Sequence, residues 1–159
     1  MQRRRGITVC IGLCGMLVLA SAAPARADGS PFVGRWHWNK AESKVPPGEP
    51  VPADMVADFS RVDSAHVRWS ITMTNAHGVP TVESFDTPAN GEFYPVSGDT
   101  TAAFVVKGNT LQGTFKGPSG EMDTLLCTLS SDTRKMRCDG KLTGMDGKSQ
   151  SYVDVYDRN

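Results

Sequence analysis

The segment HVRWSITMT, residues 66–74, alternates apolar and polar side chains along its whole length. Val67, Trp69, Ile71 and Met73 are apolar, whereas the residues between them are arginine, serine or threonine. A period of two predicts a β-strand with one buried face and one solvated face. We therefore expect a protein rich in strands, in which this segment turns its tryptophan toward the core.

Short strand-like segments continue on both sides of residues 66–74. Turn-forming pairs such as His77-Gly78, Asn90-Gly91 and Gly108-Asn109 separate them at short intervals. After residue 27 no stretch has a sustained helical period. The expected strands, about ten, cover residues 32–38, 55–62, 66–74, 81–86, 92–96, 101–107, 110–116, 122–130, 135–143 and 149–156.

This strand rhythm predicts an all-β fold. Short antiparallel strands joined by tight turns favour an up-and-down sheet that curls into a β-barrel, because closure removes the exposed edges. A two-sheet β-sandwich is the alternative. Residues 39–54, NKAESKVPPGEPVPAD, break the rhythm with four prolines. Proline disfavours strand pairing and long helices, so we expect an irregular crossing over one end of the sheet.

The first 27 residues, MQRRRGITVCIGLCGMLVLASAAPARA, are predicted to be a cleavable signal peptide, helical in its apolar part. Three arginines precede an apolar run from Ile7 to Ala20, and a small-x-small site ends at Ala27. The apolar run is too short to span a bilayer, so no permanent membrane anchor is expected. Cleavage after Ala27 would leave a single domain, residues 28–159, in the periplasm or outside the cell.

Charge disfavours one class of binding partner, and the cysteine content predicts a disulfide. Four of the 17 basic residues lie in the signal peptide, so 13 basic residues face 17 acidic ones in the mature segment, a net charge of −4. Mild acidity disfavours nucleic acid as a partner. Cys127 and Cys138 are the two mature cysteines, and an oxidising compartment favours a disulfide between them.

The sequence around the cysteines supports that pairing. Leu129 opposite Met136 across a turn near residues 131–134 places Cys127 opposite Cys138, although a bulged three-residue turn would offset the two by one. A redox-active dithiol would need a closer Cys-x-x-Cys spacing, so we predict a structural disulfide.

The mature chain opens with PFVGRWHWNKAESK, in which Gly34, Trp36 and Trp38 share one face. The Gly-x-Trp element resembles the first strand of the calycins, the lipocalin and fatty-acid-binding group. This resemblance implies a lipocalin-like barrel in which Gly34 allows a sharp bend and Trp36 plugs the closed end. Arg158 is the candidate for the arginine that stacks on the plug tryptophan in lipocalins. The helices of those families have no counterpart here.

The chain also resembles a family of small exported bacterial proteins of unassigned role. Their pattern is an opening G-x-W-x-x-N-x-x-x-S-K, a later Y-P-V-x-G and a closing V-Y-D. The matching residues are Gly34, Trp36, Asn39, Ser43, Lys44, Tyr94, Pro95, Val96, Gly98, Val155, Tyr156 and Asp157. This resemblance spans nearly all of the mature chain and implies no particular activity.

No motif indicates a metal, a cofactor or a catalytic group. His37, His66 and His77 are expected to face solvent by strand parity or turn position, and no ligand spacing accompanies them. Acidic neighbours at turns, Glu83 with Asp86 and Glu121 with Asp123, are expected to be solvated rather than to form an acid–base pair. Nucleophile-elbow and phosphate-loop patterns are absent.

Binding is therefore the predicted role. A closed barrel leaves room for one small hydrophobic or amphipathic ligand, and the expected contacts are Trp38, Trp69, Ile71, Phe104 and Phe115. The alternative is a cell-envelope or secreted interaction module, its interior filled by its own side chains and its partner bound through residues 39–54. An enzyme working at the barrel mouth is a third class. An internal cavity of a few hundred cubic ångström would favour the ligand-binding role.

Overall fold

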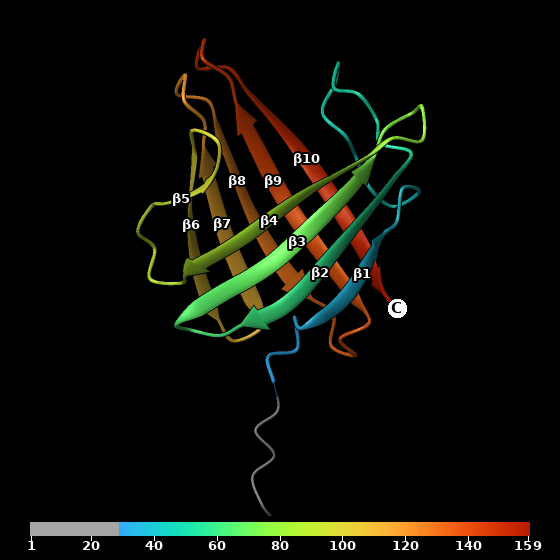
Figure 1. Ribbon diagram of the computed structural model, residues 1–159. Helices are drawn as coiled ribbons and strands as arrows, with labels where there is room; N and C mark the ends of the chain where they lie inside the picture. The colour runs from blue at the N-terminus through green and yellow to red at the C-terminus, as the bar shows by residue number, and fades with distance from the viewer. Residues whose placement is uncertain (1–28) are drawn as a thin grey trace, which may run out of the picture.

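The computed structural model describes residues 29–159, which form one nearly closed antiparallel barrel (Figure 1). The predicted signal peptide and its cleavage site lie outside these residues. The described part contains no helix of the length and apolarity that a membrane crossing requires. The strands are β1 (Gly34–Trp38), β2 (Asp54–Val62), β3 (His66–Thr74), β4 (Pro80–Pro88), β5 (Tyr94–Ser97), β6 (Thr100–Lys107), β7 (Thr110–Lys116), β8 (Met122–Leu129), β9 (Lys135–Thr143) and β10 (Ser149–Arg158).

All ten strands belong to one sheet with the order β4-β3-β2-β1-β10-β9-β8-β7-β6-β5. Neighbours along the chain pair antiparallel, and the first strand pairs with the last, with Trp38 opposite Tyr156. No ladder joins β4 to β5, but an isolated bridge between Asn90 and Val105 lies at this seam. In Figure 1, β2, β3 and β4 cross steeply over the strands of the opposite wall.

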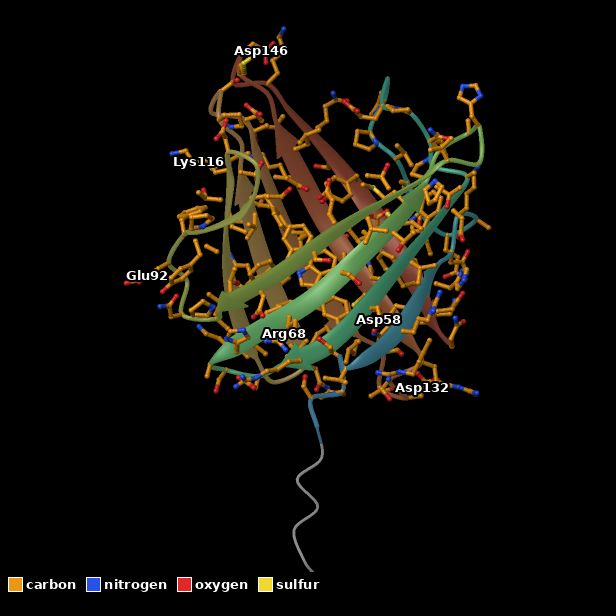
Figure 2. The ribbon with its side chains drawn as sticks, viewed as in Figure 1. Asp58, Arg68, Glu92, Lys116, Asp132 and Asp146 are labelled. Atoms are coloured by element: carbon orange, nitrogen blue, oxygen red, sulfur yellow. A yellow bond between two sulfur atoms is a disulfide. The ribbon has the colours of Figure 1, made fainter. Side chains whose placement is uncertain are left out.

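The predicted all-β barrel is confirmed, and the sandwich alternative is not what forms. Each expected strand is present, with both ends within two residues of the predicted position. One of the largest differences is at the start of β1, where the predicted strand begins at Phe32; this residue lies in a turn before β1 and is fully buried. Charged side chains such as Asp58 and Arg68 occupy the outer face (Figure 2).

Trp36, which is predicted to plug one end of the barrel, belongs to the core. Its side chain is fully buried, and its Nε1 donates a hydrogen bond of 2.8 Å to the carbonyl of Phe32. The Arg158 guanidinium lies 4.2 Å from the centroid of the indole ring, as the lipocalin resemblance implies. Arg158 also donates to the backbone carbonyls of Pro31, Val33 and Thr133.

Gly34 allows this close approach. Its φ is +133°, a conformation that residues with a side chain rarely adopt, and a Cβ there would lie 3.0 Å from Nη1 of Arg158. The absence of a side chain at Gly34 therefore leaves room for the Arg158 guanidinium against the start of β1.

The predicted disulfide is present. Cys127 and Cys138 are bonded and stand opposite each other in the β8–β9 ladder, and Leu129 stands opposite Met136. The in-register prediction is therefore confirmed, and the bulged-turn alternative does not occur.

Residues 39–53 form the expected irregular crossing. A short turn follows β1, and its start is held against β10: Ser43 Oγ accepts from Val155 N, and Lys44 exchanges two backbone hydrogen bonds with Val153. The Asn39 side chain donates to the Asp157 carboxylate over 2.8 Å. Beyond these contacts with β10, the crossing passes over one end of the barrel, where several of its residues line the interior space.

Candidate ligand-binding cavity

The barrel contains a cavity of about 500 Å³ that is partly open to solvent. Its lining includes Val45, Pro46 and Pro50 of the crossing at one end and side chains such as Met136 deeper in the barrel. Most strands contribute residues to its wall. A volume of this size is typical of sites for small organic molecules.

The five residues predicted to contact a ligand all line this cavity. They come from β1, β3, β6 and β7 and are Trp38, Trp69, Ile71, Phe104 and Phe115. The structure therefore brings them together around one space; that they contact a ligand remains a prediction. Trp36 is absent from the lining, in keeping with its predicted place at the closed end.

Aromatic rings form one wall of the cavity. Trp69 is stacked between Phe59 and Phe85, with ring centroids 5.2 Å and 4.7 Å away. Phe115 meets Trp69 and Phe85 edge-on, and Phe104 continues the cluster with a centroid 5.6 Å from that of Phe115. The rings therefore pack on one another as a core and also face the cavity.

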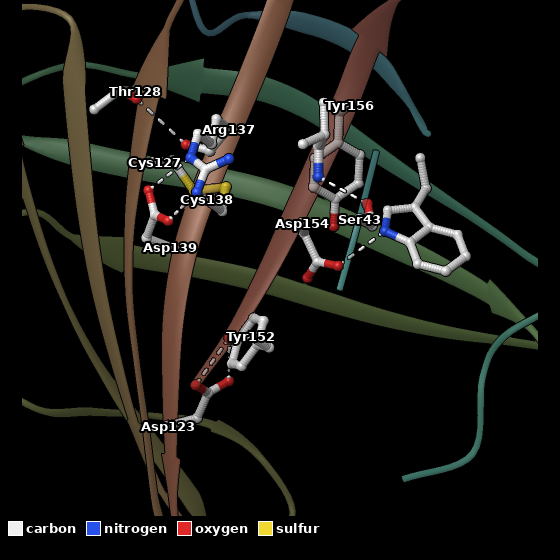
Figure 3. Close-up of a disulfide and its surroundings, with 12 residues drawn as sticks. Ser43, Asp123, Cys127, Thr128, Arg137, Cys138, Asp139, Tyr152, Asp154 and Tyr156 are labelled. Carbon is white, nitrogen blue, oxygen red and sulfur yellow. Dashed lines mark hydrogen bonds and ion pairs between the residues drawn. A yellow bond between two sulfur atoms is a disulfide. The ribbon is translucent and has the colours of Figure 1, made fainter. Parts of the chain in front are cut away.

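The wall formed by β8, β9 and β10 is polar in part. Tyr152 donates its hydroxyl hydrogen to the carboxylate of Asp123, whose two oxygens both lie 2.9 Å from the phenol oxygen. Asp154 accepts a hydrogen bond of 2.8 Å from Nε1 of Trp38. These four hydrogen-bonded side chains all line the cavity. Figure 3 shows Asp123, Tyr152 and Asp154 beside the disulfide on this wall.

Burial sets the protonation of these groups. It raises the pKa of Asp123, and the neighbouring charge of Asp154 raises it further, whereas the Tyr152 hydrogen bond opposes the change. Burial also raises the pKa of Asp154, against the effect of the Trp38 hydrogen bond. The pKa of the Tyr152 hydroxyl is raised by burial and by Asp123, so this group stays a donor.

The expectation that Asp123 is solvated is therefore wrong, and the sequence analysis does not single out Asp154. For both residues, the alternation of side chains along the strand indicates that the carboxyl group points into the barrel. Asp123 shares the face of Leu125 and Cys127 on β8, and Asp154 shares the face of Tyr156 on β10. Proximity to a turn misled the prediction, because an inward side chain near the end of a strand is still covered by the opposite wall.

Of the other polar candidates, only Glu83 lies at the cavity. Asp86 faces outward and pairs with His66 and Arg68, whereas its neighbour Glu83 lines the cavity. The His37 side chain is 44% exposed, and His77 lies in an exposed turn. Between residues 29 and 159, no three histidine, cysteine or acidic side chains are grouped as a metal site would require.

No protein-family model matches this sequence, and no curated protein is significantly similar to it. Among solved structures, the wild-type fluorescent protein UnaG superimposes with a TM-score of 0.52 at 18% identity, over 80% of this chain and 97% of UnaG. A mutant of the REP1-NXSQ fatty acid transporter gives 0.50 at 16% identity, over 80% and 98% of the two chains. EF1p2_mFAP2b bound to DFHBI gives 0.50 at 14% identity, over 81% and 94%. At such identities the likeness establishes the fold alone: residues 29–159 form an antiparallel barrel like those of these proteins.

Proposed function

We propose that this protein is an exported barrel that binds one small hydrophobic or amphipathic molecule in its interior. The cavity of about 500 Å³, with its aromatic wall, is the observation that carries the proposal. An interaction module filled by its own side chains would have no such space, so the cavity favours the ligand-binding role over that alternative.

The likeness to solved structures supports the same role. One similar structure is named as a fatty acid transporter, and another has DFHBI bound. Fold likeness is an analogy, because one barrel architecture serves many functions. The export part of the proposal rests on the amino-terminal sequence, which has the charged, apolar and small-residue regions of a signal peptide.

Native mass spectrometry of the protein purified from its own host without denaturation tests both parts. We expect a chain that begins at Asp28, lacks two hydrogens because of the disulfide, and carries extra mass that is lost on denaturation. A single native mass equal to that of the chain alone would count against a resident ligand. A chain that retains residues 1–27 would remove the export proposal.

A cavity-filling variant tests the location of binding. Ile71 faces the cavity, and its neighbour Thr72 points to the other side of β3. We expect the neutral dye Nile red to bind the wild type at one site with enhanced fluorescence. Ile71→Trp should abolish this binding, whereas the matched control Thr72→Trp should retain it. Equal binding by both variants would place the dye outside the barrel and contradict the proposal.

A further inference from the structure

The charged groups that line the cavity are all acidic. Glu49, Glu83, Asp123 and Asp154 contribute carboxyl groups to the lining, and no lysine, arginine or histidine does. Among the described residues, none of these four carboxylates takes part in an ion pair.

Acidic residues on the outer surface behave differently. Asp86 pairs with His66 and Arg68, and Asp139 pairs with Arg137. The protein thus pairs several exposed carboxylates, which water already solvates, and provides no cation for those that face the cavity. Glu49 is exposed, but for the partly buried Asp123 and Asp154 this distribution is the reverse of what burial would favour, because a buried charge needs a partner more than an exposed one.

The hydrogen bonds inside the cavity satisfy only part of the hydrogen-bonding capacity of these carboxylates. Asp123 has one donor, the Tyr152 hydroxyl, and Asp154 has one donor, Nε1 of Trp38, on its Oδ1 atom. A carboxylate accepts about four hydrogen bonds. In residues 29–159 no side chain or backbone group donates to Oδ2 of Asp154.

We infer that the ligand is an amphipathic organic cation, such as an alkylamine, whose apolar part lies along Trp69, Phe85 and Phe115 and whose positive group lies beside Asp123 and Asp154. This inference rests on the proposed ligand-binding function. An ammonium group supplies the donors and the positive charge that the carboxylates lack. A carboxylate ligand would add a further negative charge to an acidic lining.

Three probes with the same ten-carbon chain separate the ligand classes: decylammonium, decan-1-ol and decanoate, each measured by calorimetric titration at pH 7 below its micelle concentration. We expect decylammonium to bind at least tenfold more tightly than decan-1-ol, which corresponds to about 1.4 kcal/mol. Decanoate should bind most weakly of the three.

Substitutions that remove charge but keep an acceptor oxygen identify the groups responsible. The double variant Asp123→Asn with Asp154→Asn should lose about tenfold or more in affinity for decylammonium, yet retain its affinity for decan-1-ol. The unchanged affinity for the alcohol shows that the cavity is intact. Asp139→Asn, an acid-to-amide change on the outer face of β9, should leave the affinity for all three probes unaltered.

The outcomes separate this inference from the proposed function. Decan-1-ol or decanoate binding as tightly as decylammonium would overturn the organic-cation inference and leave a ligand-binding barrel. A loss of decylammonium affinity in Asp139→Asn equal to that in the double variant would also overturn it, since a distant surface charge would then explain the preference. Failure of all three probes to bind would remove the proposed function and this inference with it.

Discussion

At the scale of single residues, Trp36 is held by contacts with two other parts of the structure. It is fully buried, it donates to the Phe32 carbonyl, and Arg158 covers its ring. Trp36→Ala should lower the free energy of unfolding by about 3–5 kcal/mol, because it leaves a cavity and an unpartnered carbonyl. Urea unfolding followed by circular dichroism measures the change. A loss below about 1 kcal/mol would contradict the role of Trp36 as the plug.

Asp154 makes stability depend on pH in a direction opposite to that of most carboxylates. Its pKa is raised from 3.8 by burial, so the folded protein binds this proton more tightly than the unfolded chain. Asp154 therefore makes its full contribution to the free energy of unfolding below pH 3.8. That contribution is lost as pH rises from about 3.8 through the folded-state pKa. The groups that face it in the cavity are Trp38, Asp123, Tyr152 and Tyr156.

Asp154→Asn should therefore unfold at a higher temperature than the wild type at pH 7, and the difference should shrink as pH falls through the raised folded-state pKa of Asp154 towards about 3.8. The asparagine keeps an acceptor for Trp38 Nε1 and carries no charge. Asp139→Asn, which loses an exposed ion pair, is the control and should show no such stabilisation. A variant of Asp154 that is less stable at pH 7, with no change in the difference at lower pH, would contradict the burial argument.

At the scale of elements, the anchor of the crossing explains several residues of the exported-family pattern. Asn39, Ser43 and Lys44 from the opening motif contact Val153, Val155 and Asp157 near the carboxyl end. These contacts fix where residues 45–52 pass over the cavity. The shared motif therefore describes how the crossing is held rather than a chemical activity; membership of that family stays a prediction.

Ser43→Ala should loosen the crossing. The hydroxyl donates to the Asn39 carbonyl and accepts from Val155 N, whose residue is buried. We expect a loss of about 1–2 kcal/mol and faster amide exchange in residues 44–51, because Val155 N is left without its acceptor. Hydrogen exchange with mass spectrometry measures this, and Ser119→Ala in an exposed turn is the control. Unchanged exchange in the crossing would refute the anchor.

The β8–β9 hairpin should depend on its disulfide. The bond joins cysteines 11 residues apart, and closing a loop of that length stabilises a protein by about 3 kcal/mol. The double variant Cys127→Ala with Cys138→Ala should lose about this amount in a denaturant titration, since both side chains are buried. The wild type measured in a reducing agent should shift by a similar amount. Equal stability in the oxidised and reduced states would show that the hairpin register alone is sufficient.

At the scale of the whole molecule, alternation and turn residues were enough to predict the barrel, its strands and the disulfide register. They were not enough to predict the shape of the interior. Gly140, for example, stands opposite Tyr152, and a Cβ there would lie 2.0 Å from the phenol ring. The ring lies on bare backbone, which brings its hydroxyl to Asp123. Such fits depend on side-chain volumes across several strands, which the alternation of one strand does not contain.

A ligand held inside the barrel should stabilise the whole protein. A compound that binds only the folded state at 100 times its dissociation constant raises the free energy of unfolding by about 2.7 kcal/mol. We expect decylammonium to raise the melting temperature of the wild type and to have little effect on Ile71→Trp. A lowered melting temperature in both would show detergent-like binding to the unfolded chain instead.

The pairing of β1 with β10 has a consequence for the order of events during folding. Arg158, which covers Trp36, belongs to β10, and eight strands separate β10 from β1 in the sequence. Contacts this distant in sequence form late and slow the search for the native topology. A variant that ends before β10 should therefore remain sensitive to proteases, whereas the chain that includes this strand should resist them.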